Sequence, residues 1–168
     1  MIGLLLSAFL ACSDKEENTA PDLVNGNNTD SCGGEAPVIS AITCENTGLV
    51  EHPDYGELPT FTLRASVDDV DGDLNYYVMY VEYDEVLDGV LDSDFSEDLP
   101  PSDGAVDGES CEVESANIGI SIYLRGSTPE PATTYEWYIS IADALGKVSD
   151  PFMVVCTTPD VDGTGDPQ

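Results

Sequence analysis

Residues 133–149 read TTYEWYISIADALGKVS, and they give the strongest indication of the fold class. Large apolar side chains alternate there with smaller or polar ones, at Tyr135, Trp137, Ile139 and Ile141. A period of two places these side chains on one face of an extended strand. Residues 143–147, DALGK, then predict a hairpin turn. The stretch is therefore typical of a strand with one buried face, followed by a turn that leads into a second strand.

Similar short runs, separated by clusters of Gly, Pro and Asp, occur at 38–44, 60–67, 74–83, 116–125 and 152–157. The clearest is 60–67, which places four apolar side chains on one face: Phe61, Leu63, Ala65 and Val67. Helical spacing does not persist over a dozen residues anywhere in the chain. The pattern predicts an all-β fold, with one domain over residues 37–158.

Composition limits the classes of partner. The 168 residues include 4 Lys plus Arg against 34 Asp plus Glu, which gives a formal net charge of −30. Such a surface repels phosphate backbones, so nucleic acid is excluded as a partner. Hydrophobic residues nevertheless make up 41% of the chain, which is more than a disordered acidic segment carries and enough for a core.

Residues 133–149, with Leu124 and Pro131 before them, resemble the last strands of fibronectin type III and related bacterial immunoglobulin-like domains. The resemblance implies a single immunoglobulin-like (fibronectin type III-like) antiparallel β-sandwich with an acidic loop insertion at 84–114. It also implies that Tyr135 forms a structural corner by hydrogen-bonding to upstream backbone. The early-strand Trp of that family is absent. Instead, residues 66–74 (SVDDVDGDL) resemble the Asp-rich turn of cadherin-like and other bacterial surface modules.

The chain begins MIGLLLSAFLAC, whose apolar run is too short to span a bilayer and resembles the lipobox of bacterial lipoproteins. This predicts a signal peptide at 1–11, a lipidated Cys12 and a flexible tether that continues to residue 36. Two features depart from the family: Phe9 replaces Leu, Val or Ile, and no Lys or Arg precedes the apolar run. An ordinary secretory signal is the alternative. Ser13 favours an outer membrane lipoprotein, periplasmic or surface-exposed, held to the membrane by its lipid alone.

Four cysteines remain after Cys12, namely Cys32, Cys44, Cys111 and Cys156. An even number suits two disulfides in an oxidising compartment, and the count leaves three pairings open. The sandwich resemblance implies that Cys44 pairs with Cys156, because the first and last strands end near each other. Cys32 and Cys111 would then pair by default and staple the tether to the acidic insertion.

Calcium is the candidate cofactor. Asp69, Asp71 and Asp73 surround Gly72 on one turn, and the sandwich resemblance places Asp143 at the same pole. Hard cations take carboxylate oxygens, so these four residues are the candidate metal ligands. The alternative is that the Asp and Gly residues only form turns by hydrogen-bonding their own backbone.

Two further acidic segments carry alternative interpretations. Residues 159–166 match the first half of an EF-hand loop but lack its last ligand, so 159–168 is expected to be a disordered acidic tail. The insertion at 84–114 is expected to be a solvated loop with a short edge strand at 86–91. Alternatively, it presents Phe95, Leu99, Pro100 and Pro101 to a partner.

No catalytic arrangement is recognisable. His52 is the single histidine, and no nucleophile or phosphate-binding motif accompanies it, so we predict that the protein is not an enzyme. The favoured function is a non-catalytic, lipid-anchored envelope protein for structural display or protein interaction, with an envelope protein or polysaccharide as partner. One alternative is a calcium-dependent adhesion or carbohydrate-recognition module that stacks sugars on Tyr77, Tyr80, Tyr83 and Tyr138. The other is an accessory subunit of an envelope enzyme.

Overall fold

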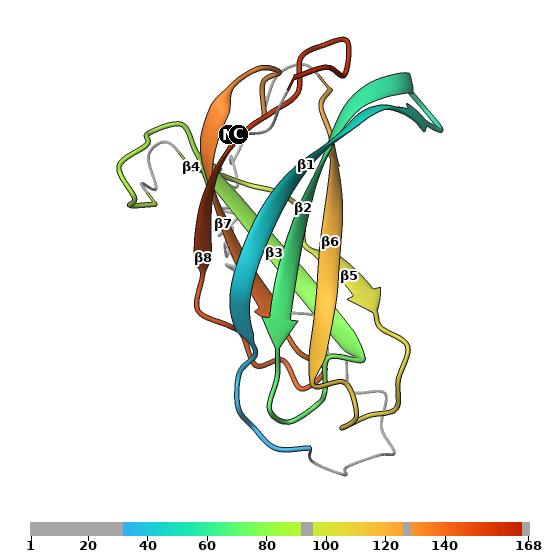
Figure 1. Cartoon of the computed structure of the whole chain (residues 1–168), viewed down its shortest axis with the longest axis vertical. Helices are drawn as coiled ribbons and strands as arrows, with labels where there is room; N and C mark the ends of the chain where they lie inside the picture. The colour runs from blue at the N-terminus through green and yellow to red at the C-terminus, as the bar shows by residue number, and fades with distance from the viewer. Residues whose placement is uncertain (1–31, 92–95, 126–128, 166–168) are drawn as a thin grey trace, which may run out of the picture.

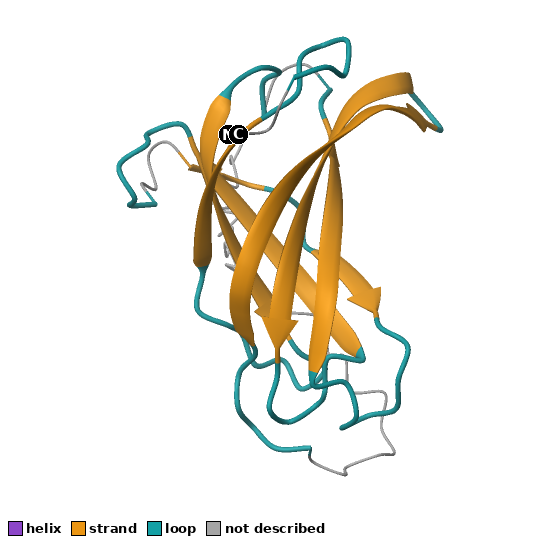
Figure 2. Cartoon of the chain, in the orientation of Figure 1, coloured by secondary structure: helices purple, strands orange, loops and turns teal. Residues whose placement is uncertain are grey.

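The computed structural model describes residues 32–91, 96–125 and 129–165, and all regular structure in these ranges is β-strand (Figure 2). The strands are β1 Val38–His52, β2 Gly56–Asp68, β3 Tyr76–Asp84, β4 Ser96–Asp98, β5 Ser102–Ala105, β6 Ser115–Tyr123, β7 Thr134–Ala142 and β8 Phe152–Thr157. These ranges hold no helix that is long and apolar enough to cross a membrane.

The strands form two antiparallel sheets, as expected for the antiparallel sandwich that the resemblance implies. One sheet has the order β1-β2-β6, and the other has the order β4-β3-β7-β8, with β5 also paired to β3. Figure 1 shows the two sheets lying face to face. Both β4 and β5 pair with the same edge of β3, β5 along Tyr76–Met79 and β4 along Glu82–Asp84. The fold is therefore a β-sandwich with an interrupted edge strand.

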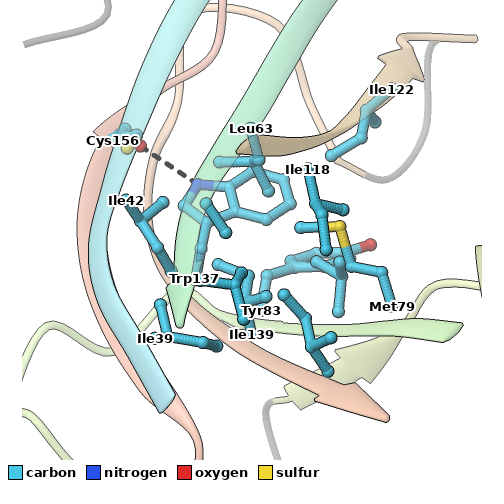
Figure 3. Close-up of a cluster of buried hydrophobic side chains, with 14 of the residues drawn as sticks. Ile39, Ile42, Leu63, Met79, Tyr83, Ile118, Ile122, Trp137, Ile139 and Cys156 are labelled. Atoms are coloured by element: carbon cyan, nitrogen blue, oxygen red, sulfur yellow. Dashed lines mark hydrogen bonds between the residues drawn. The ribbon is translucent and has the colours of Figure 1, made fainter. Parts of the chain in front are cut away.

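The core lies between the sheets, on the faces that the alternation predicts. Phe61, Leu63 and Ala65 are 0% exposed and Val67 is 1% exposed. The predicted inward residues of β7 are also fully buried: Tyr135, Trp137, Ile139 and Ile141. Figure 3 shows Trp137 among side chains from both sheets, with its Nε1–H donating to the Cys156 carbonyl at 3.4 Å. Burial of this one cluster accounts for the association of the two sheets.

A disulfide crosses the core at one end of the sandwich. Cys44 of β1 bonds to Cys156 of β8, so the bridge joins the two sheets. Cys156 lies opposite Tyr135 in the β7–β8 register, near the first residue of β7. The second disulfide joins Cys32 to Cys111 and closes a loop of 79 positions. Both pairs are those that the resemblance implies.

The first strand is much longer than predicted. The expected segment 38–44 continues to His52, and its last residues pair with β2 from Gly56 onward to form a hairpin. Figure 1 shows this hairpin projecting beyond the rest of the sheet, at the upper right. In its outer half one face is exposed and the other is only half-buried, and Leu49 on the exposed face is 44% exposed. Because neither face is fully buried, the outer half carries no alternating apolar pattern.

Two expected segments differ from the structure. Residues 86–91 form no edge strand and bend at 88–90, where the Gly89 N–H donates to both carboxylate oxygens of Glu136 at 2.8 and 3.0 Å instead of to a neighbouring strand. The edge positions are taken by β4 and β5 instead. Residues 159–165, expected to belong to a disordered tail, form a turn in which the Asn46 amide donates to the carbonyls of Gly163 and Gly165 at 3.1 and 2.7 Å.

Candidate metal centre

Two connections, β2–β3 and β7–β8, bring acidic residues to the end of the sandwich opposite the Cys44–Cys156 disulfide. Asp69 directly follows β2, Asp73 lies three positions before β3, and Asp143 directly follows β7. Backbone hydrogen bonds hold these connections together, since the Ala144 N–H donates to the Asp73 carbonyl at 3.2 Å. The chain thereby places side chains from both sheets at one pole.

The carboxylates of Asp69, Asp73 and Asp143 converge. Each offers one oxygen, and these three oxygens all lie within 4.8 Å of one another. The three residues are 2%, 1% and 0% exposed. Carboxylates are almost never buried unless they are paired or bind a metal, so this cluster requires an explanation.

In Asp69 and Asp143, one carboxylate oxygen accepts hydrogen bonds from the backbone of the turn and the other accepts none. Oδ1 of Asp69 accepts from the Asp71 N–H at 2.8 Å, and Oδ1 of Asp143 accepts from the N–H groups of Leu145 and Lys147 at 2.9 and 2.8 Å. The Oδ2 atoms of Asp69 and Asp143 are buried and have no hydrogen-bond partner. Asp69 and Asp143 can therefore both form their turns and bind a metal, because one oxygen of each accepts from the turn backbone and the other remains available to an ion.

Asp73 has no donor at all. Both of its carboxylate oxygens are buried without a partner. Burial raises the pKa of Asp73 to about 7, and the negative charges of Asp143 and Asp69 add to the effect. The nearby Asp69 carboxyl also favours the protonated form of Asp73, since a proton on one of two adjacent carboxyls removes one of the two negative charges. Burial raises the pKa of Asp143 as well, against the opposing backbone hydrogen bonds from Lys147 and Leu145.

In the part of the chain that the structure describes, no cationic side chain forms an ion pair with these carboxylates. Among the described residues, the one ion pair joins Arg64 to Glu45, far from the cluster on the exposed face of β1 and β2. Several carboxylates that share a small, desolvated space destabilise the folded state unless protons or a cation neutralise them. The arrangement therefore suits a hard divalent cation, which binds carboxylate oxygens directly.

The structure separates Asp71 from the other predicted ligands. Oδ2 of Asp71 accepts from the Glu35 N–H at 2.6 Å, so this side chain holds the segment that leads into β1. Asp71 lies on the tight turn between Asp69 and Asp73. The residue thus fastens the N-terminal segment to the pole and is not part of the carboxylate cluster.

Asn75 is an acceptor that the sequence analysis missed. Its Oδ1 is buried without a hydrogen-bond partner, two residues after Asp73 on the same connection to β3. An amide oxygen is a calcium ligand of the same hard type as a carboxylate oxygen. The spacing D-x-D-x-N at 71–75 was readable as a signal, but Asn is also a common turn residue.

The second disulfide braces the acidic turn. Gly72 has a φ of +75°, and a Cβ there would lie 2.7 Å from the carbonyl carbon and oxygen of Cys111. The Val113 N–H donates to the Gly72 carbonyl at 2.8 Å. The turn therefore packs directly on the backbone of the cysteine that bonds to Cys32. Only glycine fits this conformation and this close approach.

The other predicted residues are dispersed. Of the tyrosines proposed to stack on sugars, Tyr83 and Tyr138 are 2% and 8% exposed, whereas Tyr77 and Tyr80 are partly exposed. The Tyr83 hydroxyl donates to Glu97 at 2.8 Å, and the Tyr138 hydroxyl donates to Glu136 at 2.7 Å. These two tyrosines pack against the protein itself and offer no face to a sugar, so that part of the prediction is wrong.

The Tyr135 hydroxyl accepts from the Glu130 N–H at 2.8 Å, which is the upstream backbone contact that the corner requires. His52 lies on the projecting hairpin beside Tyr55 and Tyr123, with ring centroids 4.9 and 5.1 Å away. The lipidation residue Cys12, the signal peptide and Phe95 lie outside the described residues.

No protein-family model matches the chain, and no curated protein matches it. Among solved structures, the chain is similar to the PKD domain of an M14-like peptidase from Thermoplasmatales archaeon SCGC AB-540-F20. The two are 19% identical, the match covers 76% of this chain and 100% of the other, and the TM-score is 0.39.

Proposed function

We propose that the protein is a non-catalytic, immunoglobulin-like module of the cell envelope, exported and lipid-anchored at Cys12, whose acidic pole binds one calcium ion. One observation carries the calcium part. Asp69, Asp73 and Asp143 are buried together, and four of their six carboxylate oxygens have no partner. A domain whose only role was passive display would gain nothing from burying three carboxylates in one place.

The donor set favours calcium over other divalent ions. Every candidate ligand is an oxygen, and no His or Cys belongs to the cluster, so zinc lacks the nitrogen and sulfur ligands that it prefers. Calcium accepts six to eight oxygens in flexible geometry, whereas magnesium needs a near-ideal octahedron and retains its waters. Backbone carbonyls and water can complete the calcium shell around three carboxylates.

The position of the site suggests what the ion does. Asp69 follows a strand of the three-stranded sheet, whereas Asp73 and Asp143 flank strands of the five-stranded sheet. An ion held by all three would link the sheets at one end of the sandwich. The Cys44–Cys156 disulfide links them at the other end. Calcium would thus act as the second of two cross-links and stabilise the loops at the pole.

The export and lipid-anchoring parts of the proposal are supported by observations that do not involve the calcium site. The N-terminal sequence resembles a lipobox, and the two disulfides are of the kind that persists in oxidising compartments. Extracytoplasmic compartments also hold the calcium concentrations that occupy weak sites. The Tyr135 corner and the two antiparallel sheets support an immunoglobulin-like or fibronectin type III-like module.

A thermal melt of the oxidised full chain tests the proposal. Calcium at millimolar concentration should raise the Tm relative to EDTA, and magnesium at matched ionic strength should raise it much less. Asp143→Asn should abolish the calcium-specific rise. Asp71→Asn removes the same charge from the same pole but leaves the cluster intact, so it is the matched control and should keep the rise. Equal effects of calcium and magnesium would reject the site and leave a passive display domain.

A further inference from the structure

A second feature lies on the outer face of the five-stranded sheet and contains none of the residues of the buried cluster. Val81 and Tyr83 of β3 point into the core, so Tyr80 and Glu82 occupy the opposite face. A groove of about 660 Å³ opens there, between β3, β7 and the chain that joins β4 to β5. Its apolar and aromatic lining comes from Tyr80, Leu99, Pro100, Pro101 and Val148.

Two carboxylates face each other in this groove. Glu82 of β3 and Asp98 of β4 are direct cross-strand partners, and both line the cavity. Like charges at directly opposed positions destabilise a strand pair. Partial burial of Glu82, together with its contact to Asp98, raises the pKa of the Glu82 carboxyl. The lining residues include no Lys, Arg or His, so no side chain of the groove neutralises the pair.

The chain that borders the groove cannot extend the sheet. The Leu99 N–H donates to the Val81 carbonyl at 2.9 Å, and Pro100 and Pro101 follow without any N–H to offer. A partner that added a strand to this edge would find no donors at these two positions. Recognition here must therefore use side chains that enter the groove.

We propose that this groove binds an arginine side chain of a partner polypeptide, with the guanidinium between Glu82 and Asp98. The alkyl stem would pack on Leu99 and the prolines, and the planar head would lie against the ring of Tyr80. Arginine suits the site better than lysine, since its fork matches paired carboxylates and stacks on aromatic rings. The net charge of −30 would attract such a partner and speed its encounter.

A metal ion is the competing occupant, and the lining argues against it. Two carboxylates surrounded by Leu, Pro and Val side chains offer few oxygens to an ion that takes six or more. An apolar stem with a charged end fits a groove of mixed lining. The proposal is independent of the calcium site, because the groove shares no residue with the carboxylate cluster.

The test is an NMR titration of the ¹⁵N-labelled full chain, saturated with calcium, with acetyl-Ala-Arg-Ala-amide as the probe. The matched peptide carries citrulline, which keeps the shape of arginine and removes its charge. Saturable shifts should centre on the amides of Leu99 and Val148. The citrulline peptide should bind about tenfold more weakly, as expected when a charge-assisted hydrogen bond is lost.

Two double variants distinguish binding in the groove from general attraction of the peptide to the acidic surface. Glu82→Gln with Asp98→Asn should weaken arginine binding about tenfold, since both charged acceptors are lost. Glu51→Gln with Glu57→Gln is the control, because these residues are also direct cross-strand partners but lie on the projecting hairpin. The control should bind within about twofold of wild type, because exposed charges outside the groove are largely screened.

Several results would overturn the proposal. Equal weakening in both double variants, or shifts spread over the whole acidic surface, would mean charge attraction without a site. Equal binding of the arginine and citrulline peptides would mean that the carboxylate pair is not recognised. Competition by a further millimolar addition of magnesium for the same amides would assign the groove to a metal.

Discussion

The carboxylates of Asp73 and Asp143 lie with an oxygen of each within 4.8 Å, although the residues belong to different turns of the sandwich. Both side chains are buried, and each carries at least one oxygen without a hydrogen-bond partner. Without a cation the two carboxylates repel each other, and with a cation they hold it. A substitution at Asp73 should therefore raise stability in the absence of calcium and lower it in its presence.

Asp73→Asn should stabilise the metal-free protein and destabilise the calcium-loaded one. In EDTA at pH 7.5 the substitution removes a buried, repelled charge, and the Tm should rise by about 3–8 °C. In calcium the same substitution removes a ligand, so the variant should melt below wild type. Differential scanning calorimetry of wild type and variant in both buffers measures the two changes in Tm. A Tm change of the same sign in both buffers would argue against a metal at this cluster.

Stability should depend on pH in a direction set by the raised pKa of Asp73. The folded-state pKa of about 7 exceeds the unfolded value of 3.8, so the folded chain binds the proton more tightly. This contribution to stability is complete below about pH 4 and is lost as the pH rises through 7. In EDTA, the Tm of wild type relative to Asp73→Asn should fall between pH 5 and pH 8.

Calcium should reverse that trend, because the ion binds the ionised carboxylate and competes with the proton. Melts of wild type and Asp73→Asn at each pH, with EDTA and with calcium, measure both slopes. A Tm difference that does not change with pH in EDTA would show that Asp73 is not protonated in the folded state.

Gly72→Ala should be strongly destabilising. The new Cβ would lie 2.7 Å from the Cys111 backbone at a φ of +75°, so both steric overlap and backbone strain result. We expect a loss of about 2–4 kcal/mol in the free energy of unfolding, measured by urea denaturation. Gly146→Ala is the matched control, with a φ of +79° and nothing within 4 Å of its Cβ, and should lose only about 1 kcal/mol. Equal losses would mean that Gly72 does not pack on Cys111.

Cys12 should carry the membrane anchor. The wild-type protein expressed in a bacterial host should partition into the detergent phase of a Triton X-114 extract, because acyl chains bury many methylene groups. Cys12→Ser should remain in the aqueous phase, and intact mass spectrometry should find no acyl mass on it. A wild-type protein that is cleaved near residue 12 but carries no lipid would instead have an ordinary secretory signal.

The sequence predicts the core strands well because burial imposes the alternation directly. Leu63 and Trp137 belong to apolar sets that point into the core, and their neighbours in sequence face the other way, although Thr62 and Glu136 on that opposite face are also buried. The edge strands β4 and β5 read SED and SDGA, with no apolar alternation and little β propensity. These two strands are defined only by their hydrogen bonds to β3, so no local sequence pattern could predict them.

The candidate site was predictable in part for a similar reason. Asp69, Asp73 and Asp143 follow from the expectation that two turns share one pole. Which oxygens point inward depends on the backbone of each turn, and the sequence does not show it. Asp71 was therefore predicted as a ligand although its carboxylate accepts from Glu35, and the buried oxygen of Asn75 was not predicted. The groove at Glu82 and Asp98 depends on the register of a strand that the sequence does not mark.

Isothermal titration calorimetry of calcium into the EDTA-stripped, desalted full chain tests the central claim most directly. The account predicts one ion per chain for wild type, no saturable binding for Asp73→Asn or Asp143→Asn, and binding by Asp71→Asn within about threefold of wild type, because salt screens a nearby surface charge. Loss of binding in Asp71→Asn with retention in Asp73→Asn would contradict the account, as would a wild-type protein that binds no calcium at millimolar concentration.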